Sequence, residues 1–491
     1  MTTKLGTALA AFFLLAGIAV IIAIATVQVK RRTYVSSGLK YGIVLDAGSS
    51  RTTVYVYQWP GEKENNTGVV SETTKCSVKG PGISDMDAKA WSSLRECMVE
   101  ITKTIPANQH NSTPVFLGAT AGMRLLHQKD EQKSNTILYE IQEYLRSLPF
   151  VFHNASIISG QEEGLYGWIT VNYLMGNFLE RNVWNAWIHP HGAKTVGSLD
   201  LGGASTQIAF MAPDDARGQD LIRVSLYGYE YNVYTHSFLC YGKNEAEKKV
   251  LADLVKRSPD SQRINHPCLP DGYNTTIPGK DIFDSECTKN TRPSRFNPDR
   301  NITFLGLSDP AGCKSLVKKI FDLKSCKGKA NCSFDGVYQP PVTGDFMAYA
   351  GFYYSVLPLD LPGSNSLEKF NKSMWSMCSK SWKELRSGNT PEKFLKSYCY
   401  SANYVHTLLA DGYKFNAANW ESLDFQKEVN HTSVAWSLGY MLAQSNMIPA
   451  EAKLLKLPIS NSLFAGLLFL FSALVIITLM FLIIALVRFC Y

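Results

Sequence analysis

The chain has 491 residues, 45% of them hydrophobic, which is enough for a large core divided between two lobes. Its net charge of +7 comes from 49 Lys and Arg residues against 42 Asp and Glu residues. The basic residues are scattered, with no long basic run or aromatic-basic block, so nucleic acid is excluded as the leading class of partner.

An apolar run opens the chain. No charged side chain lies between residues 5 and 29, and the run exceeds the ~20 residues that a helix needs to cross a bilayer. A cleaved signal peptide is the alternative, but its apolar core is typically only ~7–15 residues long. We therefore expect residues 5–29 to be a retained transmembrane helix and residues 1–4 a cytoplasmic N-terminus.

The first glycine loop follows a buried strand. Residues 41–45 are apolar, Asp46-Ala-Gly48-Ser49-Ser50 follows, and residues 53–59 predict the return strand. Glycine permits close approach of a phosphate, and the two serines add hydroxyl donors. Because a carboxylate repels phosphate, Asp46 fits a ligand of a divalent cation, directly or through water. The alternative is a hairpin turn with Asp and Gly for its geometry.

A second close-approach loop follows the short predicted strand 115–117. It is Gly118-Ala-Thr120-Ala-Gly-Met-Arg124, in which Thr120 and Arg124 are the polar groups. The sequence is equally consistent with a role for Arg124 in the site and with a structural role as an ion-pair partner. Residues 136–148 have the apolar spacing of a helix.

An acidic pair lies between two glycines in Ser159-Gly-Gln-Glu162-Glu163-Gly164. Such pairs are usually solvated surface. Here an apolar and aromatic stretch follows, over residues 165–173. A carboxylate held in that setting could act as general base for water attacking phosphorus.

The first glycine loop then recurs in a second form. Residues 196–201 predict a strand that contains Asp200, the loop Gly202-Gly203-Ala204-Ser205-Thr206 follows, and residues 208–210 begin a return strand. Two copies of strand, acidic residue, glycine turn and hydroxyls predict two related lobes that face each other across a cleft.

The remainder of the chain is less regular until its end. Residues 242–344 are rich in Pro, Asn, Asp and Cys, and we expect loops and short helices held by disulfides. A short aromatic stretch covers residues 436–443, and residues 463–487 form a second uncharged apolar run. A removed lipid-anchor signal is the alternative there, but Arg488 behind the run favours a retained helix with residues 488–491 in the cytoplasm.

Lys30, Arg31 and Arg32 place the middle of the chain in the cytoplasm by the positive-inside rule. Ten cysteines between the two apolar runs indicate instead five disulfides in an oxidising compartment. Glycosylation sequons in the same segment agree with the cysteines, and they begin at Asn65, Asn111, Asn154, Asn274, Asn301, Asn331, Asn371 and Asn430. We therefore expect a multi-pass plasma-membrane protein with a large external domain, in which Cys490 is a plain cytoplasmic thiol or a palmitoylation site.

Taken together, these motifs resemble those of the ecto-nucleoside triphosphate diphosphohydrolases, or ecto-apyrases. Five short regions match in order across the whole segment between the anchors: Asp46-Ala-Gly-Ser-Ser, Gly118-Ala-Thr-Ala-Gly-Met-Arg, Ser159-Gly-Gln-Glu-Glu-Gly-Leu-Tyr-Gly-Trp, Leu199-Asp-Leu-Gly-Gly-Ala-Ser-Thr-Gln and Trp436-Ser-Leu-Gly-Tyr-Met-Leu. The two anchors and ten cysteines are similar to the plasma-membrane branch of that family.

The resemblance implies an α/β fold like that of actin, hexokinase and the heat-shock ATPases. Lobe I would cover residues 33–164 and 430–460, and lobe II residues 165–429. It implies extracellular ATP, ADP and related nucleotides as substrates, and membrane attachment through two helices that could also associate copies of the chain.

The resemblance also implies roles for individual residues. Glu163 would activate water, with Ser205, Gln207 and Thr120 around that water, and Asp46 and Asp200 would hold Ca²⁺ or Mg²⁺. The expected phosphate contacts are Gly48, Ser49, Ser50, Ala121, Gly122, Gly202, Gly203, Ala204, Ser205 and Thr206. Tyr354, Tyr398 and Trp436 would contact the nucleobase, although each fits core packing from sequence alone.

The pairing of the cysteines is likewise implied by the resemblance. It gives Cys76–Cys97, Cys240–Cys287, Cys268–Cys313, Cys326–Cys332 and Cys378–Cys399, and sequence alone does not fix it. One residue departs from the family pattern, because Arg51 stands where plasma-membrane members usually have His. Its fixed charge beside the phosphate loop leaves the balance between triphosphate and diphosphate substrates open.

Two other functions remain open at this point. A kinase of the same superfamily would share both loops and the cation but would transfer phosphate to an acceptor other than water. A cell-surface adhesion or receptor protein would use the loops only as turns.

Overall fold

The structure, a computed structural model, describes residues 2–34, 38–61, 68–181, 187–190, 194–361, 366–388, 391–447 and 461–490. The described chain divides into two compact units. One contains the terminal helices and the other, within residues 40–447, contains both sheets.

The terminal unit contains helices α1 (Thr2–Tyr34) and α15 (Asn461–Cys490). Within them, Leu5–Val27 and Ser462–Arg488 are long and apolar enough to cross a membrane. The helices pack closely at Gly17, where an added Cβ would lie 2.9 Å from Val475 Cγ2. The predicted transmembrane runs are therefore helical, and most of their apolar side chains face away from protein.

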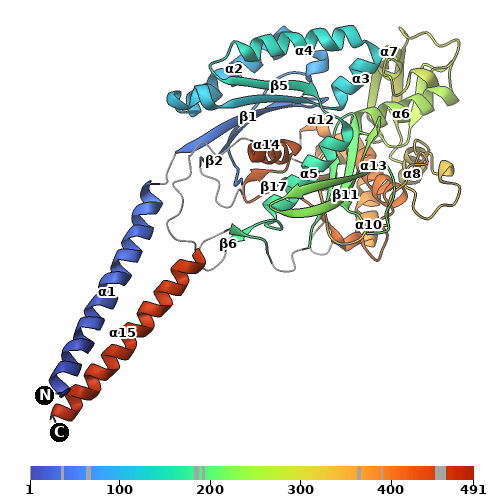
Figure 1. The fold of residues 1–491 in the computed structure, drawn as a ribbon. Coiled ribbons are helices and arrows are strands. Elements are labelled where there is room, and N and C mark those ends of the chain that lie inside the picture. The colour runs from blue at the N-terminus through green and yellow to red at the C-terminus, as the bar shows by residue number, and fades with distance from the viewer. Residues whose placement is uncertain are drawn as a thin grey trace. The chain divides into compact units, whose positions relative to one another are not determined.

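The first sheet of the larger unit has the order β3-β2-β1-β4-β5, with β1 and β5 each parallel to β4. Its strands are β1 (Leu39–Ala47), β2 (Thr52–Pro60), β3 (Ser71–Ser77), β4 (Pro114–Ala119) and β5 (Val151–Ile157). Helices α2 (Ala88–Thr104), α3 (Ala121–Lys129) and α4 (Glu131–Arg146) cover it, with the short turns η2 (Ile83–Asp85) and η3 (Ala107–Ser112) (Figure 1). A core of apolar residues that includes Ile43, Leu45 and Leu117 lies within this lobe I sheet and its helices.

The second sheet has the order β10-β11-β9-β8-β15-β16. Its strands are β8 (Gly197–Leu201), β9 (Ser205–Met211), β10 (Leu221–Leu226), β11 (Tyr229–Leu239), β15 (Phe346–Ala350) and β16 (Leu423–Phe425). The β8–β9 hairpin is antiparallel, whereas β8, β15 and β16 run parallel. This sheet is the centre of lobe II.

The two sheets share one arrangement. In each, a strand that carries an acidic residue leads through a glycine turn into a neighbouring strand, and the acidic strand pairs in parallel with a later strand. In the register of these parallel pairs, Asp46 lies opposite Gly118 and Asp200 lies opposite Tyr349. The prediction of two related α/β lobes is confirmed.

Two helices connect the lobes. α5 (Gly160–Leu174) packs against the lobe II sheet and against α14 (Trp436–Met447). An added Cβ on Gly439 of α14 would lie 2.0 Å from the carbonyl oxygen of Tyr166 on α5. On its other side α14 contacts lobe I, since an added Cβ on Gly42 would lie 2.7 Å from Met441 Cε. Both helices therefore lie centrally between the sheets (Figure 1).

Residues 242–344 contain more regular structure than we expected. They include the 15-residue helix α6 (Lys243–Arg257) and a three-stranded sheet of β12 (Arg263–His266), β14 (Asn301–Gly306) and β13 (Asn274–Pro278). The prediction of only loops and short helices is wrong for α6. Its buried face, with Ala246, Val250 and Leu254, has helical spacing that many Glu and Lys residues obscure.

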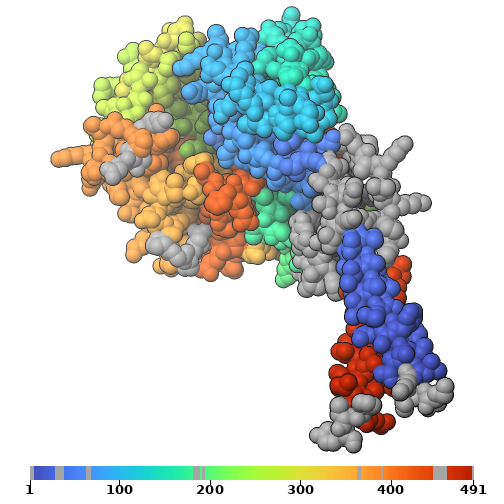
Figure 2. Space-filling model, turned by 90° about the vertical axis from the view of Figure 1, so that its left-hand side faces the viewer, coloured from blue at the N-terminus to red at the C-terminus, as the bar shows by residue number. Residues whose placement is uncertain are grey.

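The remaining elements complete lobe II and its edges. The helices are α7 (Gly279–Phe283), α8 (Pro310–Lys318), α9 (Gly351–Val356), α10 (Leu367–Cys378), α11 (Trp382–Arg386), α12 (Glu392–Leu395) and α13 (Tyr398–Thr407), with the turns η4 (Lys289–Thr291), η5 (Lys324–Cys326), η6 (Leu357–Leu359), η7 (Leu408–Gly412) and η8 (Trp420–Ser422). The short strands are β6 (Glu180–Arg181), β7 (Trp187–Ile188), β17 (Glu428–Val429) and β18 (Thr432–Ser433). The β17–β18 hairpin, orange-red in Figure 2, lies against lobe I, where Ser433 Oγ accepts a hydrogen bond from Lys75 Nζ at 2.6 Å.

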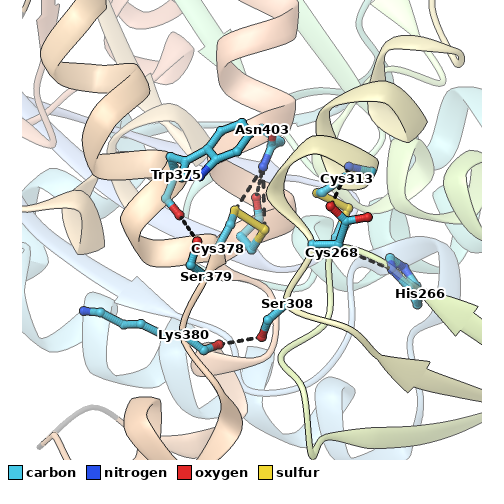
Figure 3. The surroundings of a disulfide bond; sticks show 12 residues. His266, Cys268, Ser308, Cys313, Trp375, Cys378, Ser379, Lys380 and Asn403 are labelled. Carbon is cyan, nitrogen blue, oxygen red and sulfur yellow. Dashed lines mark hydrogen bonds between the residues drawn. A yellow bond between two sulfur atoms is a disulfide. The ribbon is translucent and has the colours of Figure 1, made fainter.

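Five disulfides stabilise the larger unit, and they join the pairs that the resemblance implies. They are Cys76–Cys97, Cys240–Cys287, Cys268–Cys313, Cys326–Cys332 and Cys378–Cys399. Figure 3 shows two of them, with the buried Asn403 donating from Nδ2 to Cys378 Sγ at 3.1 Å. In the same view Ser308 Oγ donates to the Lys380 carbonyl at 2.7 Å.

Candidate active site

Asp46 ends a buried stretch of β1 at the edge of lobe I. Its Oδ1 accepts a hydrogen bond from the indole N–H of Trp436 at 2.9 Å. Burial raises the pKa of Asp46 to about 7, with repulsion from Glu163 as the next cause, while Trp436 and Arg51 lower it. A nearby cation would stabilise the charged form of a carboxylate in this environment.

Asp200 occupies the corresponding position on β8 of lobe II and is buried. Burial raises its pKa well above the ordinary range, and repulsion from Glu163 and Asp46 adds to the rise. Asp46, Asp200 and Glu163 therefore lie close enough to repel one another. Two of these carboxylates, Asp46 and Asp200, fit ligands of a divalent cation, which prefers oxygen.

The predicted phosphate loops converge at Ser49. An added Cβ on Gly122 would lie 2.8 Å from Ser49 Cα, and one on Gly203 would lie 2.7 Å from Ser49 Oγ. Glycine at position 122 therefore lets two loops of lobe I approach each other, and glycine at position 203 lets the lobe II loop approach Ser49. Gly122 also lies in the first turn of α3, where backbone N–H groups have no partner within the helix and attract anions.

The other residues expected at phosphate differ in their exposure. Ser50 is exposed and Ser49, Gly48, Gly202 and Gly203 are half-buried, whereas Ala121, Ala204, Ser205 and Thr206 are buried. The Thr206 hydroxyl donates to the Asp200 carbonyl at 2.7 Å and lies 3.1 Å from the Tyr413 hydroxyl. The hydrogen bonds of the Thr206 side chain are therefore made within lobe II. Arg51, next to Ser50, is exposed.

The two residues of the acidic pair lie in the first turn of α5, and their side chains face opposite environments. Glu162 is exposed and completes a capping box, because its Oε2 accepts from Ser159 N at 2.8 Å while its own N–H donates to Ser159 Oγ. Glu163, the next residue, is 7% exposed and points into the protein. The sequence pattern Ser-x-x-Glu could have identified Glu162 as the capping residue.

Glu163 is held by side chains from both lobes. Its Oε2 accepts from Arg124 Nη2 at 2.7 Å and from Gln207 Nε2 at 3.0 Å. Arg124 Nη2 also donates to Ser205 Oγ at 3.0 Å, and Gln207 Nε2 lies 2.7 Å from that same oxygen. Burial raises the pKa of Glu163, and the charge and hydrogen bond of Arg124 oppose the rise.

Two atoms in this cluster, Arg124 Nε and Gln207 Oε1, have no partner in the described part of the chain. Gln207 Oε1 is buried and accepts no hydrogen bond from a described residue. A buried acceptor without a donor is costly, so it fits a bound water. Thr120, which is buried at the start of α3, lies on the lobe I side of the same region.

The three aromatic residues expected at the nucleobase lie on different elements. Tyr354 is exposed on α9 and Tyr398 is half-buried at the start of α13, and these two helices pack together in lobe II. Trp436 is buried against lobe I, where an added Cβ on Gly118 would lie 2.3 Å from its ring. The structure thus gives Trp436 a contact with Asp46 that the sequence did not indicate.

Sequence reasoning also missed two residues that shape the cluster. Ser237 on β11 lies with its Oγ 2.8 Å from Gln207 Nε2, and Thr235 Oγ1 donates to the Gln161 carbonyl at 3.1 Å. Neither residue lies in a motif, and only the pairing of β11 with β9 brings them to the site. No signal in the sequence could have identified them.

Comparisons with known proteins show which sequences and folds this chain is similar to. A sequence profile described as the GDA1/CD39 (nucleoside phosphatase) family matches residues 33–457. Human ectonucleoside triphosphate diphosphohydrolase 3 is 52% identical over 483 residues, which cover 97% of this chain and 91% of the relative. Chicken (Gallus gallus) ectonucleoside triphosphate diphosphohydrolase 8 is 43% identical over 426 residues, covering 85% of each chain.

Among solved structures, the fold is similar to that of nucleoside triphosphate hydrolases from Neospora caninum. The TM-score is 0.60 at 15% identity, with 87% of this chain and 96% of that chain covered. At this identity the likeness supports the α/β fold alone.

Proposed function

The chain belongs to the GDA1/CD39 (nucleoside phosphatase) family, and from this we propose that it hydrolyses the terminal phosphates of nucleoside triphosphates and diphosphates outside the cell. The relatives named ectonucleoside triphosphate diphosphohydrolases match over most of their length, which supports a whole enzyme of that kind. The enzyme class is a hydrolase that acts on phosphoanhydrides.

One observation carries the mechanism, namely the cluster around Glu163. We infer that Glu163 takes the proton from the attacking water, while Gln207 Oε1, which has no partner among the described residues, and the hydroxyl of Ser205 orient that water. Thr120 would complete the water site. The burial of Glu163, which raises its pKa toward the working range of a general base, supports this role.

The glycine loops would hold the phosphates. Ser49, Ser50 and the first turn of α3 offer hydroxyl and backbone donors, and Gly203 offers a backbone without a side chain in the way. With donors from both loops, a phosphate chain would be held across the two lobes. Positioning and charge neutralisation of this kind account for most of the catalysis of phosphoryl transfer.

We propose that Asp46 and Asp200 hold a divalent cation, either Ca²⁺ or Mg²⁺, and Trp436 would orient Asp46. When bound, the cation neutralises charge on the phosphates. No group of three or more His, Cys, Asp or Glu side chains with the geometry of a complete metal site lies among the described residues. This fits a cation that takes its remaining ligands from substrate phosphate and water.

The base would lie between Tyr354 and Tyr398, since an exposed and a half-buried ring on two packed helices can hold a planar group. Trp436 remains a predicted base contact, although its known contact is with Asp46. The topology we propose has both termini in the cytoplasm and residues 33–460 outside, and the five disulfides support an oxidising compartment.

A time course on membranes that contain the full chain tests the proposed function. ATP with Ca²⁺ or Mg²⁺ should give ADP, then AMP, with one phosphate released at each step and no acceptor added. Phosphate that appears only with an added sugar or acid would indicate a kinase instead. No cation-dependent turnover at all would favour an adhesion or receptor protein.

A further inference from the structure

Arg124 of lobe I contacts Glu163 on the connecting helix α5 and Ser205 of lobe II. It lies on α3, and its Nη2 donates to Glu163 Oε2 at 2.7 Å and to Ser205 Oγ at 3.0 Å. Its Nη1 lies 3.4 Å from the Ile158 carbonyl. The two charged side chains are largely buried, with 14% of Arg124 and 9% of Glu163 exposed. Removing one partner of such a buried ion pair is strongly destabilising, because the other charge stays buried without compensation.

The backbone around Arg124 leaves room for this geometry. An added Cβ on Gly160 would lie 2.3 Å from Ser237 Cβ and 3.2 Å from Arg124 Nη1. Glycine at the first position of α5 therefore lets β11 and the guanidinium approach the helix that carries Glu163. The capping box of Ser159 and Glu162 fixes that same turn.

The contacts distinguish the two oxygens of the Glu163 carboxylate. Oε2 accepts hydrogen bonds from Arg124 and from Gln207. No described residue of this cluster donates a hydrogen bond to Oε1. A planar guanidinium that bonds one carboxylate oxygen and a neighbouring hydroxyl restricts the rotation of both side chains. Oε1 is thus the oxygen left for water.

The charges around Glu163 also single out Arg124. Asp46 on β1 and Asp200 on β8 both repel Glu163, and the neutral Tyr349 on β15 is the other titratable group that it influences. Arg124 is the basic group whose charge acts on Glu163. Its guanidinium therefore offsets the neighbouring carboxylates as well as fixing the geometry.

We propose that Arg124 is a positioning residue for hydrolysis, which holds Glu163 Oε2 and Ser205 Oγ so that Glu163 Oε1 faces the attacking water. The proposal rests on the proposed function and deepens it. It assigns Arg124 no contact with phosphate, because Nη2 bonds Glu163 and Ser205, Nη1 bonds the Ile158 carbonyl, and Nε is buried and has no partner among the described residues.

The test compares Arg124→Lys and Arg124→Ala with the wild-type full chain in membranes. With ATP as substrate, kcat should fall about 10- to 100-fold in Arg124→Ala while KM stays within about threefold, as expected for a lost charged hydrogen bond that acts in the chemical step. Lysine keeps the positive charge but lacks the planar guanidinium, so the kcat of Arg124→Lys should lie between those of wild type and Arg124→Ala. Millimolar guanidinium should restore part of the activity of Arg124→Ala, and methylammonium should restore less.

The pH profile gives a second, independent measurement. Because Arg124 lowers the pKa of Glu163, its removal should shift the acidic limb of kcat upward, by about one pH unit or more. Lys129→Ala is the matched control, since Lys129 lies on the same helix and bonds Asp284 of lobe II at 2.9 Å without touching Glu163. Its acidic limb should stay at the wild-type position.

Several outcomes would overturn the proposal. A rise of tenfold or more in KM with kcat unchanged would assign Arg124 to phosphate binding. An equal shift of the acidic limb in Lys129→Ala would assign the effect to the placement of α3 rather than to the guanidinium. If Arg124→Ala fails to reach the membrane, Arg124→Lys decides the question by the same two measurements. Wild-type protein without phosphate release in the same assay would refute the proposed function itself, whereas an unchanged Arg124 variant beside active wild type would refute only this inference.

Discussion

Trp436 donates its indole N–H to Oδ1 of Asp46 at 2.9 Å, although 390 positions separate the two residues. The contact joins α14, which ends the larger unit, to the first strand of lobe I. Gly118 makes it feasible, because any side chain at that position would overlap the indole ring. In the proposed cation site, this hydrogen bond to Asp46 would fix the direction of the carboxylate that holds the cation.

Trp436→Phe tests this contact. Phenylalanine keeps much of the buried ring and removes the N–H, so Asp46 should be less well oriented and half-saturation by Ca²⁺ or Mg²⁺ should need about 10-fold more cation. The measurement is ATP hydrolysis against cation concentration. Tyr440→Phe, which alters a neighbouring ring on the same helix, is the control. An unchanged cation requirement in Trp436→Phe would contradict the role.

Glu163→Gln and Glu162→Gln separate the two carboxylates. Since Glu163 is buried in the cluster and Glu162 only caps α5, the first change should reduce kcat by roughly 10² to 10⁴ and the second by much less. Glutamine at 162 can still complete the capping box. Nucleotide binding, measured separately, should survive both changes. Near-normal turnover of Glu163→Gln would refute the assignment of the base.

Direct attack by water predicts a stereochemical result. The described cluster offers hydroxyls and a carboxylate but no His or Lys contact to activate Ser205 as a nucleophile. Hydrolysis in ¹⁸O-water should therefore place the label in the released phosphate and invert the configuration at phosphorus. Retention would require a covalent intermediate and two displacements.

Two buried histidines predict loss of stability in acid. Burial lowers the pKa of His266 and of His406 to about 4, from 6.5 when unfolded. Between these values the unfolded chain binds protons that the folded chain does not, so stability is fully present above pH 6.5 and falls as the pH drops toward 4. The difference corresponds to roughly 3 kcal/mol per histidine. Unfolding temperature measured against pH should show a shallower decline in His266→Asn, whereas replacement of the exposed His153 should change nothing.

The sequons differ in how well they could carry a glycan. Asn371 is half-buried on α10, and its Nδ2 donates to the backbone carbonyl of Leu367 at 3.0 Å, whereas Asn154 is exposed on β5 and its Nδ2 donates only to the side chain of Ser156, at 3.1 Å. Of the other sites, Asn111, Asn274, Asn301, Asn331 and Asn430 are exposed, and Asn65 lies outside the described residues. Asn154→Gln should therefore increase gel mobility and Asn371→Gln should not. Glycosidase treatment of intact cells tests the external location, and a protein without any glycan would contradict it.

The sequence predicted the parts of the site that lie in one stretch of chain. The two loops after Asp46 and Asp200 could be recognised because each motif contains its strand, turn and hydroxyls within about ten residues. Glu163 was separated from Glu162 only by resemblance, and the capping box now gives the physical reason. Contacts between distant segments could not be predicted: Trp436 with Asp46, Arg124 with Ser205, and Ser237 with Gln207 all depend on how helices and strands pack.

The disulfides of lobe II have a consequence for how the chain is made. Cys240 pairs with Cys287 and Cys268 pairs with Cys313, so the two loops interleave. If the domain enters an oxidising lumen as proposed, Cys240 and Cys268 emerge there before Cys287 and Cys313, and they are the first two thiols of this set able to meet. Correct pairing then depends on thiol–disulfide exchange. Delivery of this protein to the cell surface should accordingly depend on a disulfide isomerase more strongly than that of a protein whose cysteines pair in order of emergence.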